Sequence, residues 1–215
     1  MIHKIINILT NRNSWMNKYN LVLKEKLEKL GYDVKCISSK NDLIKSDITF
    51  FLSCFELIDK EHLKLSKHNI VVHASDLPTG KGWSPASWQI LEGKNSIPVT
   101  LFEANEFVDS GKYYLKDTFD LNGSELISEW QEKLGNKIIE MCVCFVQNES
   151  VIVGKEQIGE ETFYPKRRPA DSRLDVNKTI KEQFNLLRIV DNDNYPAFFE
   201  YNGCSYKIEI SKLKD

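Results

Sequence analysis

The sequence predicts an α/β protein with a Rossmann-like, mostly parallel sheet and helices on both faces, followed by a short C-terminal strap, helix and β-hairpin. Short apolar runs alternate with amphipathic stretches through residues 1–148, the pattern of strands connected by helices. Residues 151–175 lose this periodicity and become rich in charge, Gly and Pro. Two β-rich runs near the end flank Asn202-Gly203, a strong hairpin signal. We therefore divide the chain into a main domain, residues 1–148, and a C-terminal extension, residues 149–215.

The first half of the main domain begins with a strand and a helix and continues with further strands. Leucines along residues 21–30 give one apolar face to a helix that Gly31 ends. A polar stretch around residues 59–67 is typical of a second helical piece. Apolar runs predict four strands, at residues 5–9, 32–37, 48–54 and 69–75.

The second half of the main domain continues the alternation. Ser84 and Pro85 suit the start of a helix that Gly93 closes. Residues 97–104 and 112–119 have the composition of strands. A long helix over residues 124–146 carries one apolar face, formed by Ile127, Trp130, Leu134, Ile138, Met141, Cys142 and Phe145.

The extension begins with the strap, residues 151–175, which we expect to run extended across the surface. A short helix around residues 177–190 and a hairpin within residues 197–210 complete it. Aromatic residues on the hairpin suit pairing across the axis of a homodimer; they are Phe198, Phe199, Tyr201 and Tyr206.

Composition limits the partners and the location. Lys and Arg total 29 against 31 Asp and Glu, a net charge of -2 over 215 residues, so we expect no nucleic-acid partner. No apolar run approaches the roughly 20 residues of a membrane span, and signal-peptide features are missing. We therefore expect a cytoplasmic protein with no membrane partner. The five cysteines form no CxxC pair, which predicts no disulfide frame and no metal site, but small apolar fillers of the core.

His73 stands at the end of the predicted strand 69–75, with a loop rich in Pro and Gly behind it. Ligands bind beyond the carboxyl ends of parallel strands. Asp109 follows the strand 97–104 in the comparable position, so we expect both side chains in one crevice as a pair that moves a proton. The alternatives are a histidine satisfied by a backbone carbonyl and an aspartate that serves the turn before Gly111.

The stretch "HASDLPTGKGWSPASWQILEG", followed by "IPVTLFEANEFVDSGKYY", resembles the signature of the formyltransferases that use 10-formyltetrahydrofolate. The likeness is clear over residues 47–120 and weaker elsewhere, including the strap sequence "KRRPADSRLD". It is nearest to the sugar N-formyltransferases, which are related to methionyl-tRNA formyltransferase, and it makes residues 1–148 the catalytic domain. The matching positions are His73, Ser75, Leu77, Pro78, Lys81, Gly82, Pro85, Trp88, Gly93, Val99, Thr100, Asp109 and Gly111.

The resemblance implies an enzyme that moves a formyl group from 10-formyltetrahydrofolate to an amine. Attack by the amine creates an oxyanion and a cationic nitrogen, which require hydrogen-bond donors and a proton acceptor. The resemblance places His73 beside the formyl group and gives Asp109 the role of orienting it. The family's Asn donor is replaced here by Val71, and Asn69 lies roughly 13 Å along the strand from His73. We therefore expect the oxyanion donor among Asn11, Asn13 and Ser75.

The resemblance also implies that folate docks through backbone groups of two loops, at Cys54, Phe55, Glu56, Leu57 and Val108. The substrate side is expected to include Lys81, Gly82 and Trp83. Trp83 is expected to face the cleft, while Trp88 packs its helix onto the sheet. For Lys81, contact with a phosphate and a purely solvated charge are equal alternatives. The basic run at residues 166–168 suits a diphosphate clamp or, preferably, a strap pinned to an acidic surface.

The resemblance leaves the formylated amine open. Methionyl-tRNA formyltransferase carries a longer, basic C-terminal domain, and glycinamide ribonucleotide formyltransferase lacks the strap and the hairpin. We therefore expect the amine of a nucleotide-linked amino-deoxysugar, destined for a surface glycan. The alternatives are a formyltransferase or deformylase that acts on another small molecule, and a folate-binding relative that Val71 has made inactive.

Overall fold

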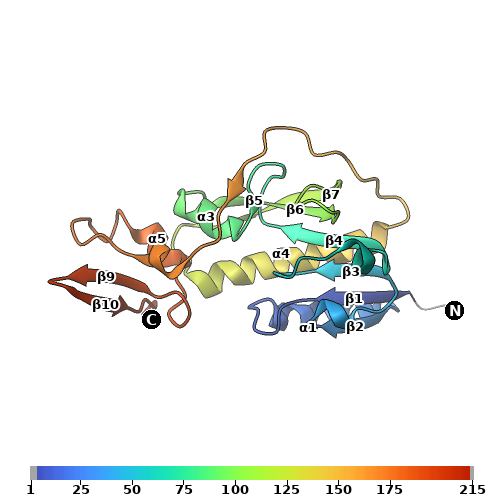
Figure 1. Cartoon of the computed structure of the whole chain (residues 1–215), viewed down its shortest axis with the longest axis horizontal. Helices are drawn as coiled ribbons and strands as arrows, with labels where there is room; N and C mark the ends of the chain where they lie inside the picture. The colour runs from blue at the N-terminus through green and yellow to red at the C-terminus, as the bar shows by residue number, and fades with distance from the viewer. Residues whose placement is uncertain (1–3, 214–215) are drawn as a thin grey trace.

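The computed structural model describes residues 4–213 and is built on one six-stranded sheet, ordered β2-β1-β3-β4-β6-β7 (Figure 1). The strands β2, β1, β3 and β4 pair in parallel, whereas β6 runs antiparallel to both β4 and β7. The predicted mostly parallel α/β architecture is confirmed. The sheet consists of β1 (Ile5–Leu9), β2 (Asp33–Ile37), β3 (Ser46–Phe51), β4 (Ser66–His73), β6 (Ser96–Glu103) and β7 (Tyr113–Asp120).

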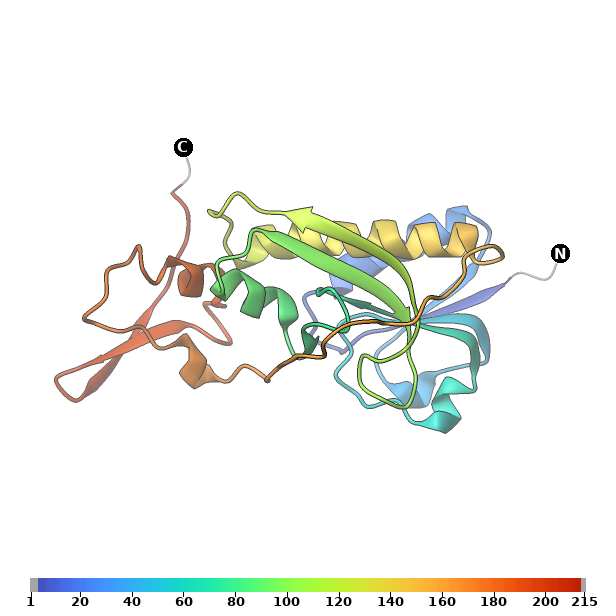
Figure 2. The same ribbon diagram turned by 90° about the horizontal axis from the view of Figure 1, so that it is seen from above.

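The two long helices, α1 (Asn17–Lys29) and α4 (Ile127–Asn148), pack against each other beside one face of the sheet (Figure 2). Their apolar sides share one hydrophobic core with alternate strand residues such as Phe50. The two helices approach each other closely at Gly135, where an added Cβ would lie only 2.7 Å from the ring of Tyr19. The predicted apolar face of the long helix is confirmed.

The opposite face of the sheet is covered by short elements and loops. The helix α2 (Lys60–Leu63) lies beside β4, and Asn69 donates a hydrogen bond to the Leu63 carbonyl. The short 3-10 helix η1 (Lys40–Asp42) lies in the segment that connects β2 to β3. This face therefore leaves the end of β4 accessible from the loops rather than from a long helix.

The chain leaves β4 through a tight loop that contains β5 (Lys81–Gly82) and then forms α3 (Pro85–Leu91). Gln89 of α3 donates a 2.7 Å hydrogen bond to the Ala74 carbonyl, which fixes the helix against the end of β4. Gly93 takes a φ of +89° directly after the helix, so this predicted stop is confirmed.

The C-terminal extension begins with the extended strap that the sequence predicts (Figures 1 and 2). The strap runs back along the molecule and pairs with β5 through β8. A hairpin then turns at Asn202 and Gly203, both with positive φ, as predicted. The elements are β8 (Phe163–Tyr164), η2 (Pro169–Ser172), α5 (Phe184–Ile189), β9 (Ala197–Tyr201) and β10 (Cys204–Ile208).

The cysteines depart from the prediction that all of them fill the core. All five thiols are free, but only Cys142 is buried, whereas Cys36, Cys144 and Cys204 are exposed. The exposed three lie on an edge strand, a solvent-facing helix position and the hairpin, where no core surrounds them. No helix within residues 4–213 is long and apolar enough to cross a membrane.

Candidate active site

His73 is the last residue of β4 and lies on the sheet face opposite α1 and α4, together with Asn69 and Val71. The residue is 8% exposed, and its Nε2 lies 2.8 Å from the Gly80 carbonyl oxygen. A carbonyl oxygen only accepts, so Nε2 donates this hydrogen bond, and Nδ1 makes none among the described residues. The alternative that a backbone carbonyl satisfies His73 therefore holds for Nε2 only, and Nδ1 is left for a ligand.

Asp109 lies near His73, although the reasoning that paired them is wrong. Because β6 is antiparallel to β4, its last residue Glu103 pairs with Ile70, so β6 ends roughly 10 Å before the end of β4. The loop from residue 104 to 112 folds back and brings Asp109 Oδ2 to 3.9 Å from His73 Nε2. Both side chains are largely buried, so a charge on the ring and the carboxylate attract each other with little screening.

The carboxylate of Asp109 is held in place by the loop that follows β4. Its Oδ2 accepts a 2.8 Å hydrogen bond from the Gly82 amide. Asp109 also has a φ of +50°, a left-handed conformation that few side chains adopt. Ser53 and Ser84 share this conformation and lie in the two neighbouring loops. Such strained residues gather where a site requires a defined loop geometry.

The environment of Lys81 matches neither predicted alternative, contact with a phosphate or a solvated charge. It is 1% exposed, which excludes a solvated charge. Its ammonium donates to Glu161 at 2.6 Å and to Ser110 at 2.8 Å, so a phosphate would have to displace the strap carboxylate. Neighbouring Gly82 is needed for close packing, because a Cβ there would lie 2.5 Å from the Tyr164 carbonyl oxygen.

The two tryptophans take different positions. Trp83 is exposed, with its ring 5.5 Å from that of Phe55 and the Lys166 ammonium 4.8 Å above it. The prediction that Trp88 packs its helix onto the sheet is wrong. Trp88 stacks on Tyr164 of the strap with an interplanar angle of 8°, and its indole donates to the Pro165 carbonyl.

Within the basic run at residues 166–168, the side chain of Arg167 fits neither interpretation. Arg167 turns inward and donates hydrogen bonds to the Ile189 carbonyl and to Ser172. Burial lowers the pKa of Arg167, and no acidic surface holds its side chain among the residues described. The run therefore joins the strap to the C-terminal elements.

The three candidate oxyanion donors differ in how they are placed. Asn11 follows β1 and accepts a 2.6 Å hydrogen bond from the Phe55 amide through Oδ1, so the orientation of its amide is fixed. Asn13 is exposed and makes no side-chain contact with the His73 region among the described residues. Ser75 is 2% exposed, and its hydroxyl is buried without a partner in the described part of the chain. Asn69 is occupied by the Leu63 carbonyl, as its distance from the strand end predicts.

The loops around His73 carry an exposed apolar rim. Of the predicted folate contacts, Phe55, Leu57 and Val108 are exposed. Phe107, which the sequence analysis missed, precedes Val108 and is 73% exposed. The thiol of Cys54 is half-buried, and burial raises its pKa. An ion pair of 2.7 Å between Lys60 and Glu106 connects α2 to the loop of Asp109. No pattern in the sequence around Phe107 predicts that its side chain is exposed.

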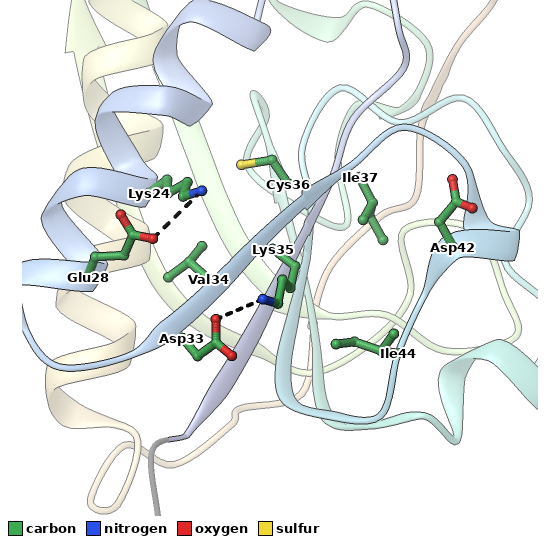
Figure 3. Close-up of a pocket in the computed structure, with 9 residues that line it drawn as sticks. All are labelled: Lys24, Glu28, Asp33, Val34, Lys35, Cys36, Ile37, Asp42 and Ile44. Carbon is green, nitrogen blue, oxygen red and sulfur yellow. Dashed lines mark ion pairs between the residues drawn. The ribbon is translucent and has the colours of Figure 1, made fainter.

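The carboxylate of Glu56 accepts a hydrogen bond from the Lys40 amide, so it is already engaged next to this rim. A separate hollow of about 420 Å³ lies between α1 and the edge strand β2 (Figure 3). It contains the ion pairs Lys24–Glu28 and Lys35–Asp33. β2 lies three strands away from β4 in the sheet, so this hollow is separate from the His73–Asp109 site.

Comparisons with known proteins were made for the whole chain. No protein-family model matches it. Methionyl-tRNA formyltransferase of Mycoplasma capricolum is 27% identical over 179 residues, which is 80% of this chain and 56% of that protein. The chain thus spans little more than half the length of this curated relative.

Solved structures share the fold at lower identity. Methionyl-tRNA formyltransferase from Clostridium thermocellum superposes with a TM-score of 0.82 at 23% identity, over 98% of this chain and 94% of that one. A sugar N-formyltransferase from a Shewanella species gives 0.71 at 15% identity, over 99% of each chain. HypX from Aquifex aeolicus in complex with tetrahydrofolic acid gives 0.74 at 20% identity, over 94% of this chain and 37% of that one.

Proposed function

We propose, because this chain is a relative of the formyltransferase family, that it transfers a formyl group from 10-formyltetrahydrofolate to a primary amine. The observation that carries the proposal is the pair His73 and Asp109, 3.9 Å apart and largely buried at the end of β4. An imidazole beside a carboxylate is suited to accept a proton near neutral pH.

The chemistry assigns a role to each side chain. When the amine nitrogen bonds to the formyl carbon, His73 accepts its proton at Nδ1, because Nε2 already donates to the Gly80 carbonyl. Asp109 stabilises the resulting imidazolium. The bond between the formyl carbon and the folate nitrogen then breaks, and the proton returns to the leaving folate. Asn11, with its Oδ1 fixed by the Phe55 amide, is our candidate to stabilise the oxyanion through Nδ2.

The exposed apolar rim supports folate as the formyl carrier. Phe55, Leu57 and Val108 offer the apolar surface that a flat heterocycle needs, and they come from the loop after β3 and the loop that carries Asp109. HypX, which shares the fold, has been solved with tetrahydrofolic acid. In this proposal the ring system lies between these loops, with the formyl group toward His73.

For the amine we propose a nucleotide-linked amino-deoxysugar. Sugar N-formyltransferase and methionyl-tRNA formyltransferase structures match nearly the whole chain alike, so the choice between them depends on the charge and the site. The net charge of -2 and the inward-turned Arg167 give little support for a tRNA-binding surface. Trp83, exposed at the site with Lys166 above its ring, is suited to stack on a base or a sugar.

The test is release of tetrahydrofolate from 10-formyltetrahydrofolate in the presence of one amine at a time. The amines are UDP-, dTDP- and GDP-linked amino sugars and methionyl-tRNA, with one reaction that contains none. Release with a single amino sugar, and a formylated product in the mass spectrum, supports the proposal. Release with methionyl-tRNA alone overturns the sugar assignment, release without an amine indicates a deformylase, and no release with any amine contradicts the enzyme.

A further inference from the structure

The middle of the strap makes polar contacts with the two loops that build the site. Lys81 and Trp83 form backbone hydrogen bonds with Thr162 and Tyr164, respectively, and extend the short pairing of β5 with β8. The strap hydroxyl of Thr162 also accepts from the Gly80 amide, next to the carbonyl that binds His73. The strap is therefore part of the walls of the site and not a distant connection.

Gln157 is the strap residue that contacts the turn of Asp109. Its Nε2 donates to the Gly111 carbonyl at 2.7 Å and to the Asp109 carbonyl at 3.1 Å. One amide group thus closes the turn across residues 109–111, whose first residue has the unfavourable φ of +50°. The Oε1 of Gln157 is buried without a partner among the residues described, so this side chain holds the turn only as a hydrogen-bond donor.

The same turn is held from its other side by a second strap residue. Glu161 pairs with the buried ammonium of Lys81, and this ammonium donates to the hydroxyl of Ser110. Ser110 in turn donates to the Val108 carbonyl. The strap therefore holds the backbone of the turn at Asp109 and Gly111 through Gln157, and it reaches the Ser110 hydroxyl through Glu161 and Lys81.

We propose that Gln157 is a positioning residue for Asp109. By binding both carbonyls of the turn, it holds the backbone conformation that directs the Asp109 carboxylate toward His73. This inference rests on the proposed formyl transfer for its kinetic consequence, but the ordering of the turn is a property of the folded chain alone. Gln157 itself is not expected to touch the formyl group or the amine.

The experiment compares Gln157→Ala and Gln157→Met with wild type in two measurements. Formyl transfer should show a kcat that falls roughly 10- to 100-fold, a larger change than any rise in KM for 10-formyltetrahydrofolate through Val108, because misplacing a group near the reacting atoms affects the rate more than binding. Hydrogen exchange at the amides of residues 107–112 should accelerate in both variants. Glu160→Ala is the matched control, since its exposed side chain makes no contact within the described residues, and it should behave as wild type.

A double-mutant cycle separates positioning from general stability. In an Asp109→Asn background, Gln157→Ala should cost little further rate, because the group that it positions has already lost its charge. Losses that multiply in the double variant overturn the proposal, as does unchanged exchange at residues 107–112. If the wild-type protein transfers no formyl group at all, the proposed function fails, and the exchange measurement still decides whether Gln157 orders the turn.

Discussion

Replacing Asp109 with Asn removes a single charge from the site and changes little else. The Asn side chain keeps an oxygen that accepts from the Gly82 amide, the hydrogen bond that now measures 2.8 Å. Asn is also among the residues that best tolerate the φ of +50° at this position. The substitution therefore tests the electrostatic role of the carboxylate without disturbing the loop.

The separation of 3.9 Å between Oδ2 and Nε2 sets the expected magnitude. With an effective dielectric constant of about 20, a carboxylate at this distance stabilises an imidazolium by about 4 kcal/mol. If the proton acceptor is charged in the transition state, losing this stabilisation slows the chemical step by roughly a thousandfold. General acid–base catalysis of this kind accounts for rate factors of about 10² to 10⁴ in other enzymes.

The assay is single-turnover formyl transfer with saturating 10-formyltetrahydrofolate and the amine that the panel identifies. Asp109→Asn should lower the rate about a thousandfold, with an unchanged unfolding midpoint. Asp109→Ala is the contrasting variant, because it loses the acceptor for Gly82 and strains an Ala at positive φ, so it should also be less stable. A rate for Asp109→Asn within a few fold of wild type would refute the electrostatic role of Asp109.

The other predictions concern the oxyanion and the acid range. Asn11→Ala should lower kcat by about 10²- to 10³-fold, and adding Val71→Asn should recover part of the loss. Asn13→Ala should leave kcat unchanged, and equal effects at both asparagines would exclude Asn11. Hydrogen bonds led by that of Lys4 lower the pKa of Glu149 from 4.5 to about 2, so its contribution to stability is complete above about pH 4.5 and disappears toward pH 2. Glu149→Gln should therefore cost on the order of 2 to 3 kcal/mol in urea unfolding near neutral pH and much less at about pH 3; an equal cost at both would contradict the linkage.

Periodicity predicted most of the fold correctly. The apolar face of α4 with Trp130, the stop of α3 at Gly93 and the hairpin turn at Asn202 depend on neighbours within a few residues of the chain. The approach of His73 to Asp109 was also predicted, from a strand-end argument that assumed a parallel β6 and from the resemblance of motifs. Local patterns contain this information, because helices, turns and hairpins are decided largely by nearby residues.

Long-range contacts account for the errors. The direction of β6 depends on which strand it joins, and an apolar run has the same composition in a parallel or an antiparallel pair. The burial of Lys81 and the stacking of Trp88 depend on Glu161 and Tyr164, about 75 to 80 residues later in the strap. Since the strap lacks periodicity, its sequence does not reveal which loops it covers.

The strap is also synthesised later than the two loops that it contacts. A ribosome completes His73 and Asp109 well before Gln157 and Glu161, and at about 5 to 20 residues per second the interval is several seconds. Until then a nascent chain has the whole central sheet, His73 and Asp109, and the turn is held by its contacts with Lys81 and Gly82. We therefore expect the turn to reach its final order only after the strap has docked and added the contacts of Gln157 and Glu161.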